Sequence, residues 1–67
     1  MVSRFTIKYP VAVVPEVGRT VTFNVGELNV TMQITNVVDK EERDEYYNFY
    51  TLEGYVEKVE DAGVLHS

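Results

Sequence analysis

The pattern of apolar and polar positions predicts a β-hairpin whose two-residue loop is Gly26-Glu27. Pairing residues outwards from this loop matches apolar with apolar: Val25 with Leu28, Phe23 with Val30, and Val21 with Met32. The same register matches polar with polar: Asn24 with Asn29, Thr22 with Thr31, and Thr20 with Gln33. Because successive strand side chains point to opposite faces, one register gives a sheet with an apolar and a polar face. Glycine at the first loop position favours a type II′ turn.

Alternation predicts two further strands. Over residues 3–9, Phe5, Ile7 and Tyr9 share one face, which is typical of a half-buried strand, and Pro10 then interrupts the pattern. The longest alternating stretch covers residues 46–57 and is expected to pair with 28–38. The register that best matches its apolar residues pairs Val38 with Tyr46, Ile34 with Tyr50, Met32 with Leu52, and Leu28 with Val56.

In that register the even-numbered residues of 46–57 face the apolar side. The odd positions include Glu53 and Glu57, which would be costly to bury without partners. Gly54 falls opposite Val30, and a glycine inside a strand indicates a bulge or a sharp bend.

The connections between the strands are also marked in the sequence. We expect a short extended piece over Val11–Val14 and a turn over Pro15–Gly18, where glycine can take a positive φ. In the charged connection 39–45, Asp39 and Glu42 fit a capping box, which favours one helical turn near 39–46; an exposed, disordered loop is the alternative. The pattern fades after residue 57, so 58–67 are expected to be a frayed or loosely docked tail.

These elements predict a single all-β domain over residues 1–67. Four to five antiparallel strands with short connections favour a small SH3-like barrel or roll. The spacing of Pro15, Gly18, Val21 and Phe23 resembles the strand start of many SH3-like barrels, although this generic pattern covers nine residues and indicates no family.

Composition narrows the classes of function. The chain has 67 residues, 6 Lys and Arg against 11 Asp and Glu, a net charge of -5, and no cysteine. A disulfide or a thiolate zinc site is therefore excluded, and the negative charge opposes binding to a phosphate backbone. No apolar stretch approaches the ~20 residues of a membrane span, and the start of the chain does not resemble a signal peptide. We expect a soluble, cytoplasmic protein.

Catalytic chemistry has little support in the sequence. Nucleophilic catalysis needs a nucleophile beside a base, but the chain has only Ser3, Ser67 and His66, all near its ends. Glu53 and Glu57 could act as a carboxylate pair only within a pocket, and a domain of this size seldom has one of ~300 Å³. The acidic residues of 39–45 lack the alternation and central glycine of a calcium loop. We therefore expect no enzyme activity, no metal and no cofactor.

An aromatic stripe is the remaining candidate site. If even positions point inward, Tyr47, Phe49 and Tyr55 point outward, and aromatic residues are enriched at protein interfaces. The acidic residues that would border the stripe are Glu53, Glu57, Glu41, Glu42, Asp44 and Glu45. Alternatively, the aromatic residues are there because they favour strands, and another segment covers them.

Three functions are compatible with these features. The first is a non-enzymatic protein-interaction module that docks on a basic partner surface or self-associates. Its narrower form is an inhibitor or nucleic-acid mimic, including a virus-encoded one. The second is a barrel that binds single-stranded nucleic acid by stacking bases on the aromatic face, which the charge disfavours. The third is a small enzyme that uses Glu53 and Glu57.

Overall fold

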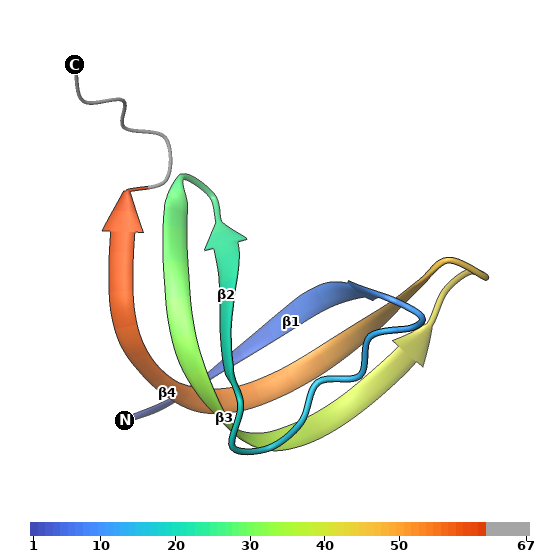
Figure 1. Ribbon diagram of the computed structural model, residues 1–67, viewed down its shortest axis with the longest axis horizontal. Coiled ribbons are helices and arrows are strands. Elements are labelled where there is room, and N and C mark those ends of the chain that lie inside the picture. Colours follow the sequence, from blue (N-terminus) through green and yellow to red (C-terminus); the bar gives the residue numbers. More distant parts are fainter. Residues whose placement is uncertain (62–67) are drawn as a thin grey trace.

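The computed structural model describes residues 1–61, which form one antiparallel sheet of four strands (Figure 1). The strands are β1 (Val2–Pro10), β2 (Thr20–Val25), β3 (Leu28–Glu42) and β4 (Tyr47–Asp61). Their order across the sheet is β1-β4-β3-β2, so β1 and β2 are the two edges. Within residues 1–61 there is no helix of the length and apolarity that a membrane crossing requires.

The predicted hairpin between β2 and β3 is confirmed. All six predicted pairs are present, from Val25 with Leu28 to Thr20 with Gln33. Gly26 has a φ of 60°, whereas Glu27 keeps a negative φ. Of the two common turns in two-residue hairpins, only type II′ needs a positive φ at the first loop position alone, so the turn type is also as expected.

The predicted register between β3 and β4 is wrong. Ile34 pairs with Gly54 instead of Tyr50, and Met32 pairs with Val56 instead of Leu52. The ladder contains three register shifts, between Thr31 and Met32, between Ile34 and Asn36, and between Val37 and Asp39. Each shift inserts an extra residue in one strand, which a pattern of constant period cannot show. None of the four predicted pairs between these strands is formed.

The predicted direction of the side chains holds over the first half of β4. Asn48, Tyr50 and Leu52 are buried there, whereas Tyr47 is exposed and Phe49 is half-buried. Beyond Gly54 the alternation breaks. Val56 pairs with buried Met32 and Val59 pairs with buried Val30, so one even and one odd residue reach the same inner face.

Three further expectations about connections are corrected. The helical turn near 39–46 is absent, because β3 continues to Glu42, which pairs with Asn48 of β4. Residues 11–14 form no strand; the N–H of Val13 donates to the carbonyl of Pro10 (2.9 Å) in a turn. β4 runs on to Asp61, so residues 58–61 are paired strand and not tail. The rest of the predicted tail, residues 62–67, lies outside the described residues.

The turn before β2 agrees with the sequence, shifted by one residue. The N–H of Arg19 donates to the carbonyl of Glu16 (3.2 Å), and Gly18 takes a φ of 92° at the third position of this turn. A positive φ at this position is typical of a type II turn, which favours glycine there.

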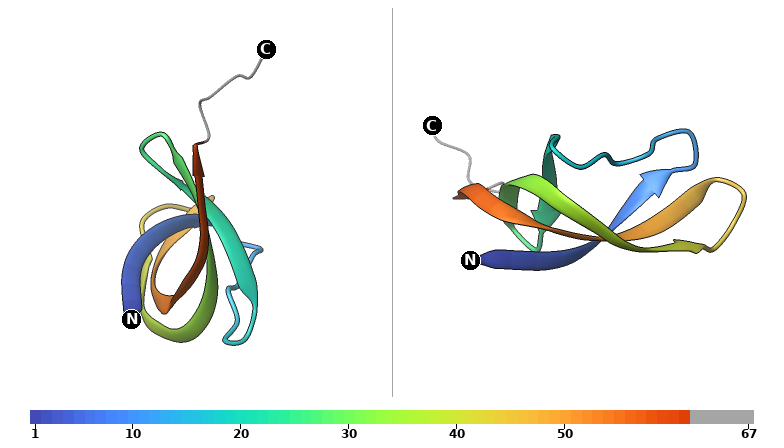
Figure 2. Two further views of the ribbon diagram at one scale, coloured as in Figure 1. Left: turned by 90° about the vertical axis from the view of Figure 1, so that its left-hand side faces the viewer. Right: turned by 90° about the horizontal axis from the view of Figure 1, so that it is seen from below.

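The sheet bends strongly but does not close into a barrel (Figure 2), so the predicted barrel is only partly formed. β3 and β4 each pass through the bend. On one side lies the hairpin arm, made of β2, residues 28–34 and residues 54–61. On the other lies the N-terminal arm, made of β1, residues 36–42 and residues 47–53.

The core lies on the inner face at the bend. It consists of Met32, Ile34, Tyr50 and Leu52, all almost fully buried. Partly buried residues of β1, β2 and β3 pack around it: Phe5, Ile7, Tyr9, Val21, Phe23 and Val37. Since both arms supply these side chains, the core stabilises the angle between the arms.

Gly54 is required at the bend, as the sequence indicated, although its partner is Ile34 and not Val30. A β-carbon at residue 54 would overlap the carbonyl oxygen of Gln33 and would come within 2.7 Å of Cγ of Met32. The absence of a side chain therefore allows β3 and β4 to approach closely where the sheet turns.

Candidate protein-interaction surfaces

The predicted aromatic stripe lies on the outer face, but two of its three rings are covered by cations. The ammonium of Lys8 lies 4.2 Å from the centroid of the Tyr47 ring, and the guanidinium of Arg43 lies 4.7 Å from that of Phe49. Such cation–π contacts occupy the ring faces that a partner would use. Tyr55, which is 49% exposed, is the most exposed ring of the stripe, and Tyr47 is 38% exposed beside its cation.

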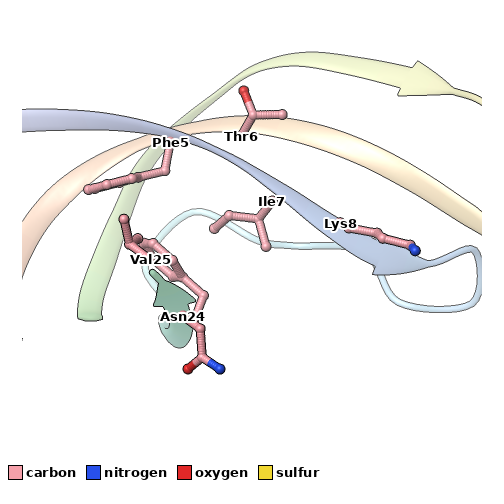
Figure 3. A pocket seen from close by; sticks show the side chains of 7 residues that line it. Phe5, Thr6, Ile7, Lys8, Asn24 and Val25 are labelled. Atoms are coloured by element: carbon pink, nitrogen blue, oxygen red, sulfur yellow. The ribbon is translucent and has the colours of Figure 1, made fainter. Parts of the chain in front are cut away.

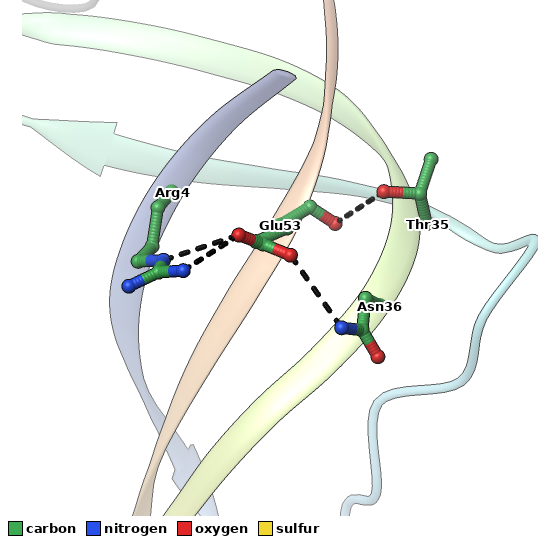
Figure 4. Close-up of polar contacts among 4 residues, drawn as sticks. All are labelled: Arg4, Thr35, Asn36 and Glu53. Carbon is green, nitrogen blue, oxygen red and sulfur yellow. Dashed lines mark hydrogen bonds and ion pairs between the residues drawn. The ribbon is translucent and has the colours of Figure 1, made fainter.

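Glu53, one of the acidic residues expected to border the stripe, links three strands (Figure 4). Its Oε2 accepts from Nη2 (2.8 Å) and Nε (3.3 Å) of Arg4 on β1, and its Oε1 accepts from Nδ2 of Asn36 on β3 (3.4 Å). The hydroxyl of Thr35 donates to the backbone carbonyl of Glu53 (3.2 Å). The hydrogen bonds from Arg4 and Asn36 lower the pKa of the Glu53 carboxyl. This carboxylate is therefore committed within the sheet.

Most acidic residues of the connection between β3 and β4 are also engaged in ion pairs or hydrogen bonds within the chain. Glu41 pairs with Arg43, and Glu42 pairs with Lys40 at 3.3 Å. Oδ1 of Asp44 accepts from the N–H groups of Tyr46 (2.7 Å) and Tyr47 (2.8 Å). These two hydrogen bonds lower the pKa of the Asp44 carboxyl and fix the path of the chain into β4.

Nearly all positive charge on residues 1–61 is already paired. The ion pairs are Arg4–Glu53, Arg19–Glu16, Lys40–Glu42, Arg43–Glu41 and Lys58–Glu60. The sixth cation, Lys8, lies over Tyr47. The carboxylates without an ion-pair partner in this part of the chain are Glu27, Asp39, Asp44, Glu45, Glu57 and Asp61. The surplus charge of the surface is therefore carried by carboxylates.

The structure reveals an apolar surface that the sequence did not predict. Val25, Leu28, Val56 and Val59, here called the inner patch, lie on the inner face of the hairpin arm and are 38–53% exposed. The register shift between Thr31 and Met32 brings Val59 to the same face as Val56. Nothing in the sequence indicated this arrangement, because the alternation fades after residue 57 and Val59 was expected to lie in the tail.

A pocket of about 300 Å³ adjoins this region between the edge strands β1 and β2 (Figure 3). Its lining residues are Phe5, Thr6, Ile7, Lys8, Phe23, Asn24 and Val25. The sequence predicted no pocket of this size. Lys8 is the only ionisable lining residue, and neither Glu53 nor Glu57 lines the pocket, so the carboxylate pair considered for catalysis does not share it.

The two ends of β4 differ in what they offer a ligand. In the first half of the strand the outer residues are occupied by cations and hydrogen bonds, whereas Val56 and Val59 in the second half are open.

Among residues 1–61, no three metal-ligating side chains gather closely enough to hold an ion. No family model, curated protein or solved structure matches this chain.

Proposed function

We propose that this chain is a non-enzymatic protein-interaction module that docks on a basic partner through its inner patch. The observation that carries the proposal is the inner patch itself, a group of exposed apolar residues within a surface of unpaired carboxylates. Glu27 lies in the loop between Val25 and Leu28, Glu57 lies between Val56 and Val59, and Asp61 pairs with Leu28. Contiguous exposed apolar side chains with a charged rim are typical of interaction sites.

The charge distribution favours a basic partner. The hairpin arm carries Glu27, Glu57, Glu60 and Asp61 against a single cation, Lys58, which pairs with Glu60 at 3.2 Å. Such a surface attracts a cationic partner during encounter and repels acidic ones. The same surplus of negative charge suits an inhibitor, virus-encoded or otherwise, that mimics nucleic acid on its target.

The inner patch is a better docking site than the outer stripe. A partner that bound Tyr47 and Phe49 would first have to displace Lys8 and Arg43 from their rings. A partner that bound Val56 and Val59 would displace only water from apolar side chains, which is favourable. Binding of single-stranded nucleic acid is disfavoured for the same reason, since stacking needs open ring faces and free cations.

The test is affinity capture followed by direct titration with the purified partner. Two matched variants separate the surfaces: Val56→Thr with Val59→Thr makes the inner patch polar at nearly constant volume, and Tyr47→Ala with Phe49→Ala removes the outer rings. We expect the first to lose the partner and the second to retain it, with circular dichroism confirming that both are folded.

Two outcomes would contradict the proposal. If the outer variant loses the partner and the inner variant retains it, the site lies on the outer face. If the wild-type chain binds a single-stranded oligonucleotide with affinity that falls steeply with salt, the protein is a nucleic-acid-binding module instead.

A further inference from the structure

We propose that the free edge of β2 takes up an extended segment of the protein partner as a fifth strand, which places an apolar side chain in the pocket between β1 and β2. This inference rests on the proposed function and specifies the binding mode and the chemistry of the bound segment. Addition of a strand to an open sheet edge combines backbone hydrogen bonds with side-chain pockets.

The hydrogen-bond pattern shows which backbone groups of β2 are available. The N–H of Ile34 donates to the carbonyl of Arg19 (2.9 Å), immediately before β2. Bonded residues alternate along an antiparallel ladder, so the odd-numbered residues of β2 exchange bonds with β3. The N–H and C=O groups of Thr20, Thr22 and Asn24 therefore point to the free edge, where a new strand can bond to them.

The other edge of the sheet is protected against the same pairing. The N–H of Val11 donates to the carbonyl of Tyr46 (2.9 Å), so the odd-numbered residues of β1 bond to β4. The backbone N–H and C=O groups of its even-numbered residues therefore point to the free edge of β1. These residues include Pro10, which has no N–H, and the charged Arg4 and Lys8. Proline and charges on an edge strand oppose strand addition. β2 has neither, and its free-edge residues are all uncharged.

The pocket supplies a place for side chains of the added strand. Asn24 lines it from β2, and Thr6 and Lys8 line it from β1, while the apolar side chains of Phe5 and Ile7 point from β1 toward β2 (Figure 3). A strand on the β2 edge would point alternate side chains to this inner face. At about 300 Å³, the pocket is at the lower end of the range for ligand sites.

Charge defines the bound segment further. A segment antiparallel to β2 begins beside the hairpin loop, where Glu27 has no ion-pair partner among residues 1–61, so a cation belongs at its first position. Farther along, no carboxylate lines the pocket, so a second cation would find no partner there. The outward neighbours Thr22 and Asn24 are polar and uncharged. The segment therefore has one leading cation followed by alternating apolar and uncharged polar residues.

The test uses a defined heptapeptide, acetyl-Lys-Val-Thr-Val-Thr-Val-Thr-amide, and the full chain. Amide hydrogen exchange, followed by NMR, is measured for Thr20, Thr22 and Asn24 with and without saturating peptide. We expect exchange at these free-edge amides to slow by about fivefold or more, because each new hydrogen bond is worth about 1 kcal/mol. Peptide N-methylated at its Thr residues, whose N–H groups would face β2, should bind about tenfold more weakly or not at all.

Matched variants test which edge is used. Thr22→Pro removes a free-edge N–H of β2, and Val2→Pro removes one of β1 at a residue that does not line the pocket. Thr22→Pro also removes a cross-strand hydroxyl contact of 3.1 Å to Thr31, so Thr22→Val, which loses the hydroxyl and keeps the N–H, is measured beside it. Thr22→Pro should weaken peptide binding about tenfold, while Val2→Pro and Thr22→Val should leave it within about twofold. Should Thr22→Pro fail to fold, the N-methylated peptide tests the same hydrogen bonds in the wild-type chain.

The outcomes distinguish this inference from the proposed function. If the peptide shifts the methyl resonances of Val56 and Val59 without slowing exchange at Thr22 and Asn24, the inner patch binds but strand addition is wrong. Equal binding by the unmodified and the N-methylated peptide also overturns strand addition. If the Val56→Thr, Val59→Thr variant still binds the captured partner, the proposed function fails, whatever the peptide does.

Discussion

The rings of Phe5 and Phe23 meet edge to face, with centroids 4.9 Å apart and planes inclined at 60°. Phe5 belongs to β1 and Phe23 to β2, the two edge strands that the ladder does not join. The contact therefore links the two arms of the sheet by side chains alone. It also forms one boundary of the pocket, which both residues line.

This contact should appear as a coupling energy in a double-mutant cycle. Replacing Phe5 and Phe23 by Ala, singly and together, should give a coupling of about 1 kcal/mol, since aromatic pairs of this geometry contribute that much beyond burial. Urea unfolding monitored by circular dichroism measures it. The control cycle combines Phe5→Ala with Phe49→Ala on the opposite face and should be additive. Additivity in the first cycle would show that the arms are not linked by these rings.

Gly54→Ala should be among the most destabilising substitutions in the chain. Its β-carbon would overlap the backbone of Gln33, which cannot move without disturbing the bend, so we expect a loss of about 3 kcal/mol or more. Gly26→Ala is the matched control, because its β-carbon meets nothing and only the positive φ is unfavourable, at about 1 kcal/mol. Denaturant unfolding compares them. Equal losses would contradict the close approach at the bend.

The contribution of Glu53 to stability should depend on pH. Its folded-state pKa is lowered by Arg4 and Asn36, so the unfolded chain binds the proton more readily than the folded one. The stabilisation is therefore complete above the ordinary pKa of a glutamate and is lost as the pH falls through the lowered value. Glu53→Gln should destabilise the protein at pH 7 and much less at pH 3, measured by urea midpoints. Glu57→Gln, which removes an unpaired carboxylate, is the control and should not show this dependence.

Asp44 should order the start of β4. Asp44→Ala removes the acceptor for the N–H groups of Tyr46 and Tyr47, so their amide exchange should quicken and the melting temperature should fall. Asp44→Asn retains an acceptor oxygen without the charge, so its exchange rates and melting temperature should lie between those of Asp44→Ala and the wild type. Unchanged exchange at both amides in Asp44→Ala would show that the carboxylate does not hold this connection.

The sequence predicts the parts of this fold that depend on unbroken periodicity. The β2–β3 hairpin follows from a two-residue loop and strict alternation, so its whole register could be inferred from local pairs such as Val25 with Leu28. Gly54 marked the bend correctly. The β3–β4 register could not be inferred, because three inserted residues shift the pairing and the sequence shows none of them.

The candidate site was missed for the same reason. With a constant period, Val56 faces Leu28 and Val59 falls in a tail, whereas the bulge places both on the inner face of a paired strand. Conversely, the outward direction of Tyr47 was predictable from alternation, but the cation over its ring was not. Lys8 reaches this ring because β1 pairs with β4, a contact between residues about forty positions apart.

The pairing of β1 with β4 also has a consequence for the order of assembly during translation. Of the four strands β1 is made first, and β4, the strand with which it pairs, is made last. Phe5 and Ile7 therefore cannot pair until residues 47–55 have emerged from the ribosome. The β2–β3 hairpin can form earlier from neighbouring residues, since short loops close fastest. The nascent chain therefore exposes an unpaired apolar strand until β4 has been made, and this is the interval in which this sheet is most vulnerable to proteases and to aggregation.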